Sequence, residues 1–202
     1  MMRKKEHNMK KINLGMAITL LLLIQGCGVS DTAIENEIDK SRGFDLWDYM
    51  TSPLNYEVEY DFYENGKKTD YYIEENRLFN EGTTFERKSI SGSTTYYLNS
   101  RYILMKEPTR EVEIHRYIKL GDNNVFIASN IENCRAEEFY PKYKIYNLTF
   151  NNVLMLSCLG KTGVKEKLYY GYSEGIITRY QEEKGDTREY VKVKEAQIFE
   201  KK

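Results

Sequence analysis

Beyond residue 30 the chain has two cysteines, Cys134 and Cys158, and one histidine, His115, and these side chains are the best suited to redox, metal or nucleophilic chemistry. The cysteines lie 24 positions apart. In an oxidising compartment such a pair predicts a disulfide, which would stabilise the fold by roughly 3 to 4 kcal/mol in the chain-entropy model. Two buried free thiols and a redox-active pair are the alternatives. The chain has no Cys-x-x-Cys motif to lower the pKa of either thiol, which argues against the redox role.

Any nucleophilic triad or thiol hydrolase in this part of the chain would have to use His115. This histidine alternates with Glu113 on the polar side of a predicted strand, which favours a solvent-exposed side chain. One histidine also excludes a zinc site built from several histidines, and a mixed site would need both Cys134 and Cys158. We therefore predict no catalytic residue and no bound metal, and we expect the protein not to be an enzyme.

Closely spaced carboxylates are the next candidates for acid and base chemistry. Glu57 with Glu59, and Glu137 with Glu138, could serve as the two carboxylates of a glycosidase. With 31 Asp and Glu residues in the chain, however, such pairs arise from composition alone. Nothing in the pattern indicates the burial that would raise the pKa of one member. We interpret these four side chains as solvent-exposed.

Two loop motifs that would hold an ion or a phosphate are incomplete or missing. Residues 122–124 (Asp-Asn-Asn) begin like a calcium-binding loop, but Ile127 and Asn133 stand where that loop requires Gly and Glu. The chain also lacks a Gly-rich loop of the kind that cradles phosphates. We therefore predict no cofactor.

Tyrosine is unusually abundant, with 18 residues that all follow position 48. Tyrosine suits a sheet surface that packs on apolar side chains and also meets solvent, so sheet packing accounts for most of these residues. The alternative is that some line a concave face that holds a sugar, a peptide or a lipid. The doublets 71–72, 96–97 and 169–170 place one ring on each face of a strand, so at least three rings should point away from the core. The sequence names no particular ligand-binding residue.

The segments that position these residues alternate apolar and polar side chains with a period of two residues, as strands do. Tyr56, Val58 and Tyr60 fall on one side of a strand, and Asn65-Gly66 then supplies the positive φ angles of a tight hairpin turn. Helix-like spacing over 44–50 predicts one short helix with Trp47 at the core edge. The predicted strands cover 55–63, 68–75, 83–90, 94–98, 101–106, 111–119, 125–128, 142–150, 153–158, 164–172, 175–182 and 187–193, with a turn at Asn151-Asn152.

Eleven or twelve short strands without helical crossovers indicate an all-β fold: an antiparallel meander that forms a half-barrel, a barrel or a sandwich, with a short N-terminal helix. Residues 150–156, 168–170 and 175–177 resemble the closing hairpins of many bacterial cell-envelope proteins. That resemblance implies a twisted antiparallel meander and no enzymatic activity.

Charge excludes nucleic acid as a partner. The first 26 residues hold five basic residues and one acidic residue, which leaves 25 basic and 30 acidic residues and a net charge of about −5 on the rest. Residues 1–26 have the positive start and the apolar run of a signal peptide, whether translation begins at Met1 or Met9. The apolar run of residues 14–24 is too short to cross a bilayer.

Residues 23–27 (Leu-Ile-Gln-Gly-Cys) resemble the lipobox of bacterial lipoproteins. The resemblance implies cleavage before Cys27 and attachment of diacylglycerol to its thiol, so the membrane would be a partner through this lipid anchor. Gly28 differs from the Asp that retains enterobacterial lipoproteins at the inner membrane. In a Gram-negative cell we therefore expect the outer membrane, with the protein facing the periplasm.

These features divide the chain into a signal peptide (1–26), a lipidated cysteine with a linker (27–43) and an antiparallel β domain (44–202). We expect a lipid-anchored, extracytoplasmic, non-catalytic binding or structural module at the bacterial cell envelope, which meets an envelope protein through a sheet edge or a tyrosine-bearing face. The alternative is a carrier or receptor of lipid or another apolar ligand, which would need a half-barrel cavity lined by apolar residues.

Overall fold

The computed structural model describes residues 43–52, 55–90, 92–127 and 131–197. The predicted signal peptide, Cys27 and the linker up to residue 42 lie outside these residues. Most of the described chain is strand, which confirms the all-β class, and the predicted short helix is present. The elements are β1 (Phe44–Asp45), α2 (Leu46–Met50), β2 (Tyr56–Glu64), β3 (Lys67–Phe79), η1 (Asn80–Gly82), β4 (Thr84–Ser89), β5 (Gly92–Leu98), β6 (Tyr102–Glu107), β7 (Arg110–His115), β8 (Tyr117–Ile118), β9 (Phe126–Ile127), β10 (Ile131–Ile145), β11 (Leu148–Gly160), β12 (Lys165–Gly171), β13 (Gly175–Glu183) and β14 (Asp186–Gln197).

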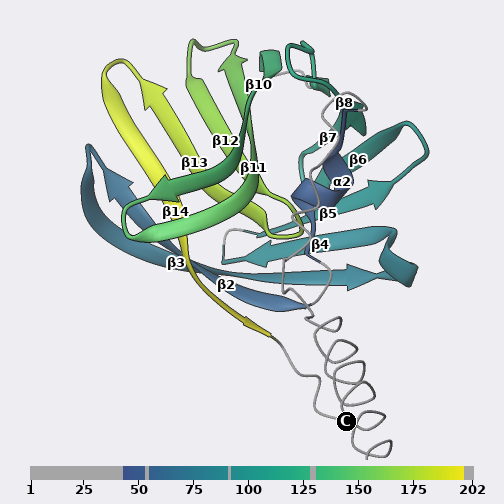
Figure 1. Ribbon diagram of the computed structural model, residues 1–202, viewed down its shortest axis with the longest axis horizontal. Coiled ribbons are helices and arrows are strands. Elements are labelled where there is room, and N and C mark those ends of the chain that lie inside the picture. Colours follow the sequence, from purple (N-terminus) through teal and green to yellow (C-terminus); the bar gives the residue numbers. More distant parts are fainter. Residues whose placement is uncertain (1–42, 53–54, 91, 128–130, 198–202) are drawn as a thin grey trace, which may run out of the picture. The chain divides into compact units, whose positions relative to one another are not determined.

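Twelve strands form one antiparallel sheet in the order β10-β11-β12-β13-β14-β2-β3-β4-β5-β6-β7-β9. It consists of two meanders, β2 to β7 and β10 to β14, which are joined where the last strand, β14, pairs with β2. The sheet curls strongly, so the two meanders face each other as the walls of a half-barrel (Figure 1). β1 and β8 form a separate two-stranded sheet.

The segment between β8 and β9 connects the two edges of the half-barrel. The His115 amide donates to the Val125 carbonyl at 2.9 Å, and the Val125 amide donates to the Cys134 carbonyl at 2.9 Å. A further bond runs from the Ala136 amide to the Asp122 carbonyl at 3.0 Å. Through these bonds β7 and β10 are held together near Val125, although the two strands do not pair along their length.

Helix α2 packs into the core as one short, capped turn. Asp45 accepts a hydrogen bond from the Trp47 amide at 3.1 Å, which is the N-cap arrangement. Trp47 is buried and donates from its indole nitrogen to the Gly82 carbonyl at 3.1 Å, which confirms its place at the core edge. Among the helices of the described ranges, none combines the length and the apolarity needed to span a bilayer.

The predicted hairpin turn of the first long strand is confirmed, and its period-two pattern holds up to Tyr60 but not at Asp61, which we expected on the outer side and which is buried. Val58 and Tyr60 are buried, while Glu57 is exposed. Asn65 and Gly66 have φ angles of 48° and 77°, as a turn with two left-handed central residues requires. The right-handed twist of the two strands matches this turn, which explains why β2 and β3 stay paired over most of their length.

The prediction for residues 131–158 was wrong in its boundaries. The chain turns at Tyr146, not at Asn151-Asn152, and β10 runs through Pro141. β10 is an edge strand, which is where a sheet can accommodate a proline. Asn152 has a φ of 51° inside β11 and lies across from Pro141, between the pairs Tyr140↔Val153 and Lys142↔Asn151. These residues bend the hairpin where we had expected a turn.

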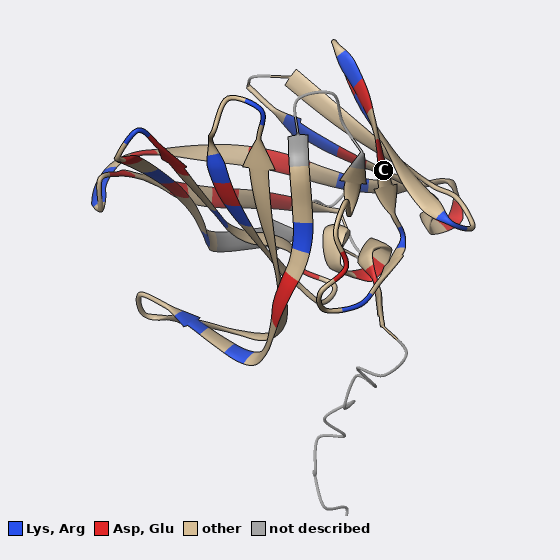
Figure 2. Cartoon of the chain, turned by 90° about the horizontal axis from the view of Figure 1, so that it is seen from above, with Lys and Arg blue, Asp and Glu red and all other residues tan. Residues whose placement is uncertain are grey.

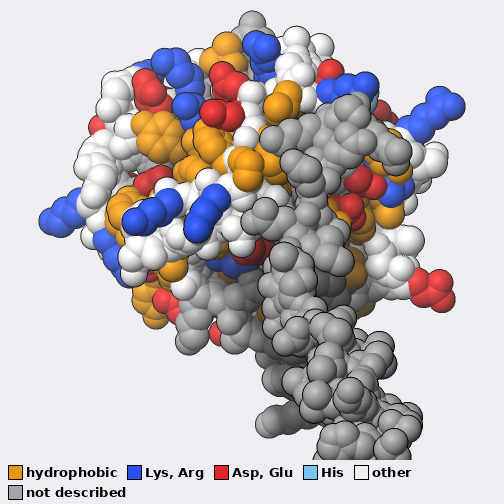
Figure 3. Space-filling model, viewed as in Figure 1, with side chains coloured by type: hydrophobic (Ala, Val, Ile, Leu, Met, Phe, Trp, Pro, Cys, Tyr) orange, Lys and Arg blue, Asp and Glu red, His pale blue; other side chains and the backbone are white. Residues whose placement is uncertain are grey.

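Beyond this bend the β10–β11 hairpin folds over the outer face of the C-terminal meander. The Tyr143 ring stacks on Tyr169 with 4.8 Å between centroids, and Tyr146 stacks on Tyr63 at 4.9 Å. Thr178, which pairs with Tyr169, is fully buried. Figure 3 shows hydrophobic side chains gathered on the face that the hairpin crosses in Figure 1. The hairpin therefore adds a second layer outside the barrel wall.

Candidate functional site

The inner face of the half-barrel contains a cavity of about 800 Å³. This volume falls within the range of roughly 300 to 1,000 Å³ that is usual for small-molecule sites. Residues of β3 to β7 line one side, and residues of β11 to β13 line the other. We call Glu74, Arg87 and Tyr96 the N-terminal wall, and Glu166, Tyr170, Arg179 and Gln181 the C-terminal wall.

The N-terminal wall is a closed hydrogen-bonded group. Arg87 donates from Nη2 to Glu74 Oε1 at 3.1 Å and from Nε to Glu74 Oε2 at 3.3 Å. Its remaining nitrogen, Nη1, donates to the Tyr96 hydroxyl at 3.2 Å. The Glu74 and Arg87 side chains are 9% and 20% exposed. Burial alone would lower the pKa of Arg87, but the Glu74 carboxylate together with Tyr96 and Tyr60 outweighs it and holds that pKa well above its ordinary value.

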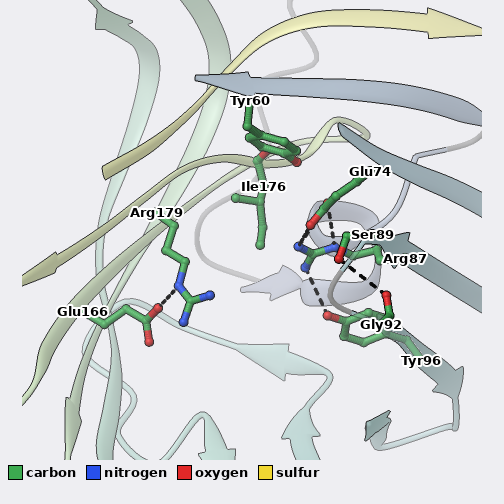
Figure 4. Close-up of polar contacts among 9 residues, drawn as sticks. All are labelled: Tyr60, Glu74, Arg87, Ser89, Gly92, Tyr96, Glu166, Ile176 and Arg179. Atoms are coloured by element: carbon green, nitrogen blue, oxygen red, sulfur yellow. Dashed lines mark hydrogen bonds and ion pairs between the residues drawn. The ribbon is translucent and has the colours of Figure 1, made fainter. Parts of the chain in front are cut away.

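The C-terminal wall carries a second ion pair that is more open. Arg179 donates from Nε to Glu166 Oε1, and Gln181 donates to the same oxygen at 3.3 Å. The Arg179 side chain is 45% exposed, more than twice the value for Arg87. In Figure 4 the two ion pairs lie on opposite sides of the same space, and the Arg179 guanidinium points into it.

A buried tyrosine completes the C-terminal wall. Tyr170 is 3% exposed and lines the cavity. Burial is the main reason that its pKa is raised, with a smaller contribution from Tyr96. Its hydroxyl therefore stays protonated and can donate a hydrogen bond to a bound molecule.

The rest of the lining is mixed in character. Apolar contact comes from Met105, Phe126, Leu168 and Ile176. Residues in the hairpin turns of both meanders, or in the strands next to them, contribute hydroxyl groups and further charges, namely Ser93, Thr94, Thr109, Thr162, Glu107, Arg110 and Lys161. The cavity has the size that the carrier alternative required, but its lining contains seven charged residues where that alternative needed an apolar surface.

Sequence reasoning missed the charged residues of both walls because it assigned charged side chains to the outer face. Arg87 shares its side of β4 with the buried Phe85, and Glu166 shares its side of β12 with the buried Leu168. The usable signal was a charged residue in phase with apolar neighbours. Elsewhere acidic and basic residues are interspersed along the strands, as Figure 2 shows.

The predicted disulfide is present. Cys134 and Cys158 are directly opposite each other on β10 and β11, with 4.0 Å between their Cα atoms, and form a disulfide bond. Cys134 falls between the predicted strands 125–128 and 142–150, where the sequence indicates a loop, and the structure places it in the edge strand β10 instead. Cys158 also lines the cavity, so this bond supports its wall. Cys27, the predicted lipidation site, lies outside the described residues.

The other predicted candidates lie on the surface. His115 and Glu113 are exposed on β7, and Glu57, Glu137 and Glu138 are exposed as expected. Glu59 is half-buried. Within the described ranges, no three His, Cys, Asp or Glu side chains come close enough to hold a metal ion.

The tyrosine doublets divide between the two faces as predicted. Tyr72 stacks on Tyr60 inside the half-barrel at 4.9 Å, while Tyr71 is 58% exposed. Tyr96 lines the cavity and Tyr97 is exposed. Tyr169 also points away from the cavity, but the β10–β11 hairpin covers it.

The expectation that the chain has no Gly-x-Ser-x-Gly motif is wrong. Residues 171–175 (Gly-Tyr-Ser-Glu-Gly) have the spacing of a Gly-x-Ser-x-Gly nucleophile elbow. In the structure they form the turn between antiparallel strands β12 and β13, whereas an elbow leads from a strand into a helix. Ser173 has a φ of 58°, but in the described part of the chain no hydrogen bond joins its hydroxyl to His115. The turn therefore does not have the strand-to-helix geometry of a nucleophile elbow.

Comparisons with known proteins add a likeness of fold. No protein-family model matches the chain, and no curated protein matches it. A crystal structure of a Bacteroides fragilis protein, described as inferred to be exported and as having a YmcC-like fold, matches 77% of this chain and 100% of its own, with a TM-score of 0.51 and 9% identity. A LolA-superfamily protein from Nitrosomonas europaea matches 77% of this chain and 91% of its own, with a TM-score of 0.24 and 8% identity. The first of these shares the fold.

Proposed function

We propose that the protein is an extracytoplasmic binding protein, held at the bacterial cell envelope by a lipid on Cys27, which binds a polar ligand in the half-barrel cavity without catalysis. The observation that carries the proposal is the cavity of about 800 Å³ with charged and hydroxyl-bearing walls. Buried charges are costly to fold around, so a site that retains them inside a concave surface is a candidate for recognition.

The lining favours a polar ligand over an acyl chain. The C-terminal wall offers both a donor and an acceptor: the half-exposed Arg179 guanidinium donates, and the Glu166 carboxylate accepts. An acyl chain in this space would remove water from these groups and give them no hydrogen bond in return. A molecule with hydroxyl or charged groups can replace that water.

The location at the envelope is supported by two separate features. Residues 23–27 resemble a lipobox, and the Cys134–Cys158 disulfide is of the kind that persists in oxidising compartments. The membrane is thus a partner through the lipid. An envelope protein that docks on a sheet edge or on exposed tyrosines remains a prediction from the sequence, which the cavity neither requires nor excludes.

The test is to purify the full chain from its own cell envelope in mild detergent and to analyse it by native mass spectrometry. We expect a small polar molecule bound to the wild-type chain. Gln181→Trp places an indole in the cavity and should abolish this binding. Glu182→Trp is the matched control, because Glu182 is the next residue on β13, faces away from the cavity and is not part of its lining.

Circular dichroism should show the same β signal in both variants. A wild-type chain with no bound small molecule, or equal binding in the two tryptophan variants, would contradict the proposal. The native mass spectra also report the lipid anchor. We expect diacylglycerol on an N-terminal Cys27, and an unmodified thiol would rule the anchor out.

A further inference from the structure

The charges that line the cavity differ in sign from those of the protein as a whole. Four basic residues (Arg87, Arg110, Lys161 and Arg179) and three acidic residues (Glu74, Glu107 and Glu166) face it, which gives a net charge of about +1. Residues 27–202 together carry about −5. A cavity that is positive inside a negative protein attracts an anionic molecule in preference to a cationic one.

The three carboxylates are already matched by three arginines. Glu74 pairs with Arg87 at 3.1 Å, Arg110 Nη2 donates to Glu107 at 3.1 Å, and Glu166 accepts from Arg179. Among the residues that the structure describes, Lys161 has no carboxylate within ion-pair distance. The excess positive charge in the cavity is therefore available to a ligand.

Arg179 differs from Arg87 in how many of its donors are used. Arg87 engages Nε, Nη1 and Nη2, whereas Arg179 engages Nε. Within the described part of the chain, the two Nη nitrogens of Arg179 make no hydrogen bond. Figure 4 shows that they point towards the space between the walls. A planar guanidinium with two free nitrogens matches the two oxygens of a carboxylate or a phosphate.

Both walls supply groups for the rest of such a molecule. Tyr96 accepts from Arg87, so its own hydroxyl proton is free to be donated across the cavity. Tyr170 offers a second neutral hydroxyl beside Arg179. The oxygen of Glu166 that does not bind Arg179 or Gln181 can accept from a ligand hydroxyl. These groups suit hydroxyls placed next to an oxyanion.

From this geometry we infer that the ligand of the proposed cavity carries an oxyanion, a carboxylate or a phosphate-like group, which the two Nη nitrogens of Arg179 bind. The inference rests on the proposed function and specifies its ligand. Gln181 positions Arg179 indirectly, because it shares the Glu166 oxygen that holds the guanidinium in place.

The test uses the full chain in detergent after dialysis against 1 M sodium chloride to remove bound molecules. Inorganic phosphate and acetate are titrated separately at constant ionic strength with chloride, and the melting temperature is followed by tyrosine fluorescence. We expect at least one of the two anions to raise the melting temperature saturably. The two arms distinguish a phosphate-like group from a carboxylate.

Arg179→Gln should weaken the apparent affinity for that anion at least tenfold. Arg77→Gln is the matched control and should leave it unchanged, since Arg77 lies on the outer face of β3 in an ion pair with Glu75 at 3.3 Å. The inference fails if neither anion binds saturably, or if both variants respond like the wild type. In that case a neutral polar molecule that co-purifies with the wild type and is lost in Gln181→Trp would still support the proposed function.

Discussion

The two walls of the cavity contain the same pair of residue types, an arginine and a glutamate, in different states. On the N-terminal wall all three Arg87 nitrogens have protein partners, and Glu74 is almost completely buried. On the C-terminal wall Arg179 is half exposed and uses one nitrogen. The difference separates a pair that maintains the fold from a pair that can change partners when a ligand arrives.

The difference follows from the positions of the walls in the sheet. β3, β4 and β5 are consecutive strands in the middle of the N-terminal meander, so Glu74, Arg87 and Tyr96 are neighbours across paired strands. Glu166 is the second residue of β12, next to the turn that precedes this strand, and Arg179, in the middle of β13, has a side chain that is 45% exposed. Water therefore reaches the second pair more readily, which reduces its contribution to stability.

The largest effect should come from breaking the closed pair. Glu74→Gln leaves the Arg87 charge buried without its counterion, and we expect the free energy of unfolding to fall by about 3 to 5 kcal/mol. Urea denaturation followed by circular dichroism measures this change. Glu75→Gln, on the outer face of the same strand, should cost less than about 1 kcal/mol. A loss of similar size in both variants would mean that the N-terminal pair is not structural.

The next effect concerns the edge of the C-terminal meander. Replacing both cysteines, in Cys134→Ser/Cys158→Ser, should lower the free energy of unfolding by about 3 kcal/mol, because the unfolded chain regains the freedom of the 24-residue loop. Unfolding in urea with and without a reductant measures it. The free energy of unfolding of the double variant should not change with reductant. That of the wild type should fall on reduction towards the value of the double variant. Unchanged wild-type stability on reduction would show that the bond does not support this wall.

Opening the C-terminal pair should have a much smaller effect on folding. Glu166→Gln keeps the shape of the side chain and removes a partly exposed counterion, so we expect less than about 1 kcal/mol of lost stability. Binding of the co-purified molecule should weaken in the same variant, because Arg179 loses the group that orients it. A stability loss as large as that of Glu74→Gln would remove the contrast between the walls.

The smallest effect tests the outer layer of the C-terminal meander. Tyr146 donates to Glu189 at 2.9 Å in an exposed position, and Tyr146→Phe should cost about 0.5 kcal/mol while it retains the stacking on Tyr63. Tyr146→Ala removes both contacts and should cost more. Hydrogen exchange of β10 and β11 would report any release of the hairpin. Equal stability of the Phe and Ala variants would show that the hairpin tip does not hold the layer in place.

The sequence predicts the individual strands well because alternation and turn residues are local signals. Val58, Tyr60 and the Asn65-Gly66 turn show this for β2 and β3. It fails at Pro141 and Asn152, since whether such residues form a turn or a bend depends on which strand lies at the sheet edge. It also cannot show that β14 pairs with β2, because that contact joins distant parts of the chain.

The cavity was the harder feature to predict. The period-two pattern places Arg87 on the same side of β4 as the buried Phe85. We nevertheless expected charged side chains on the outer face, so the pattern did not identify Arg87 as an inward-facing residue. The meeting of Arg87 and Arg179 across one space requires the curl of the whole sheet, which no local pattern contains. The disulfide was predictable because only two cysteines were available to form it beyond Cys27.

Arginine modification tests the contrast between the two walls most directly. The full chain in detergent is treated with phenylglyoxal, with and without saturating phosphate, and the extent of modification at each arginine is read by peptide mass mapping. The same treatment is repeated with saturating acetate. We expect Arg179 to react in the free protein and to be protected by at least one of the two anions, and Arg87 to stay unreactive throughout. Modification of Arg179 at the same rate in the free protein and with either anion, or faster modification of Arg87, would contradict a cavity that binds its ligand through an open arginine.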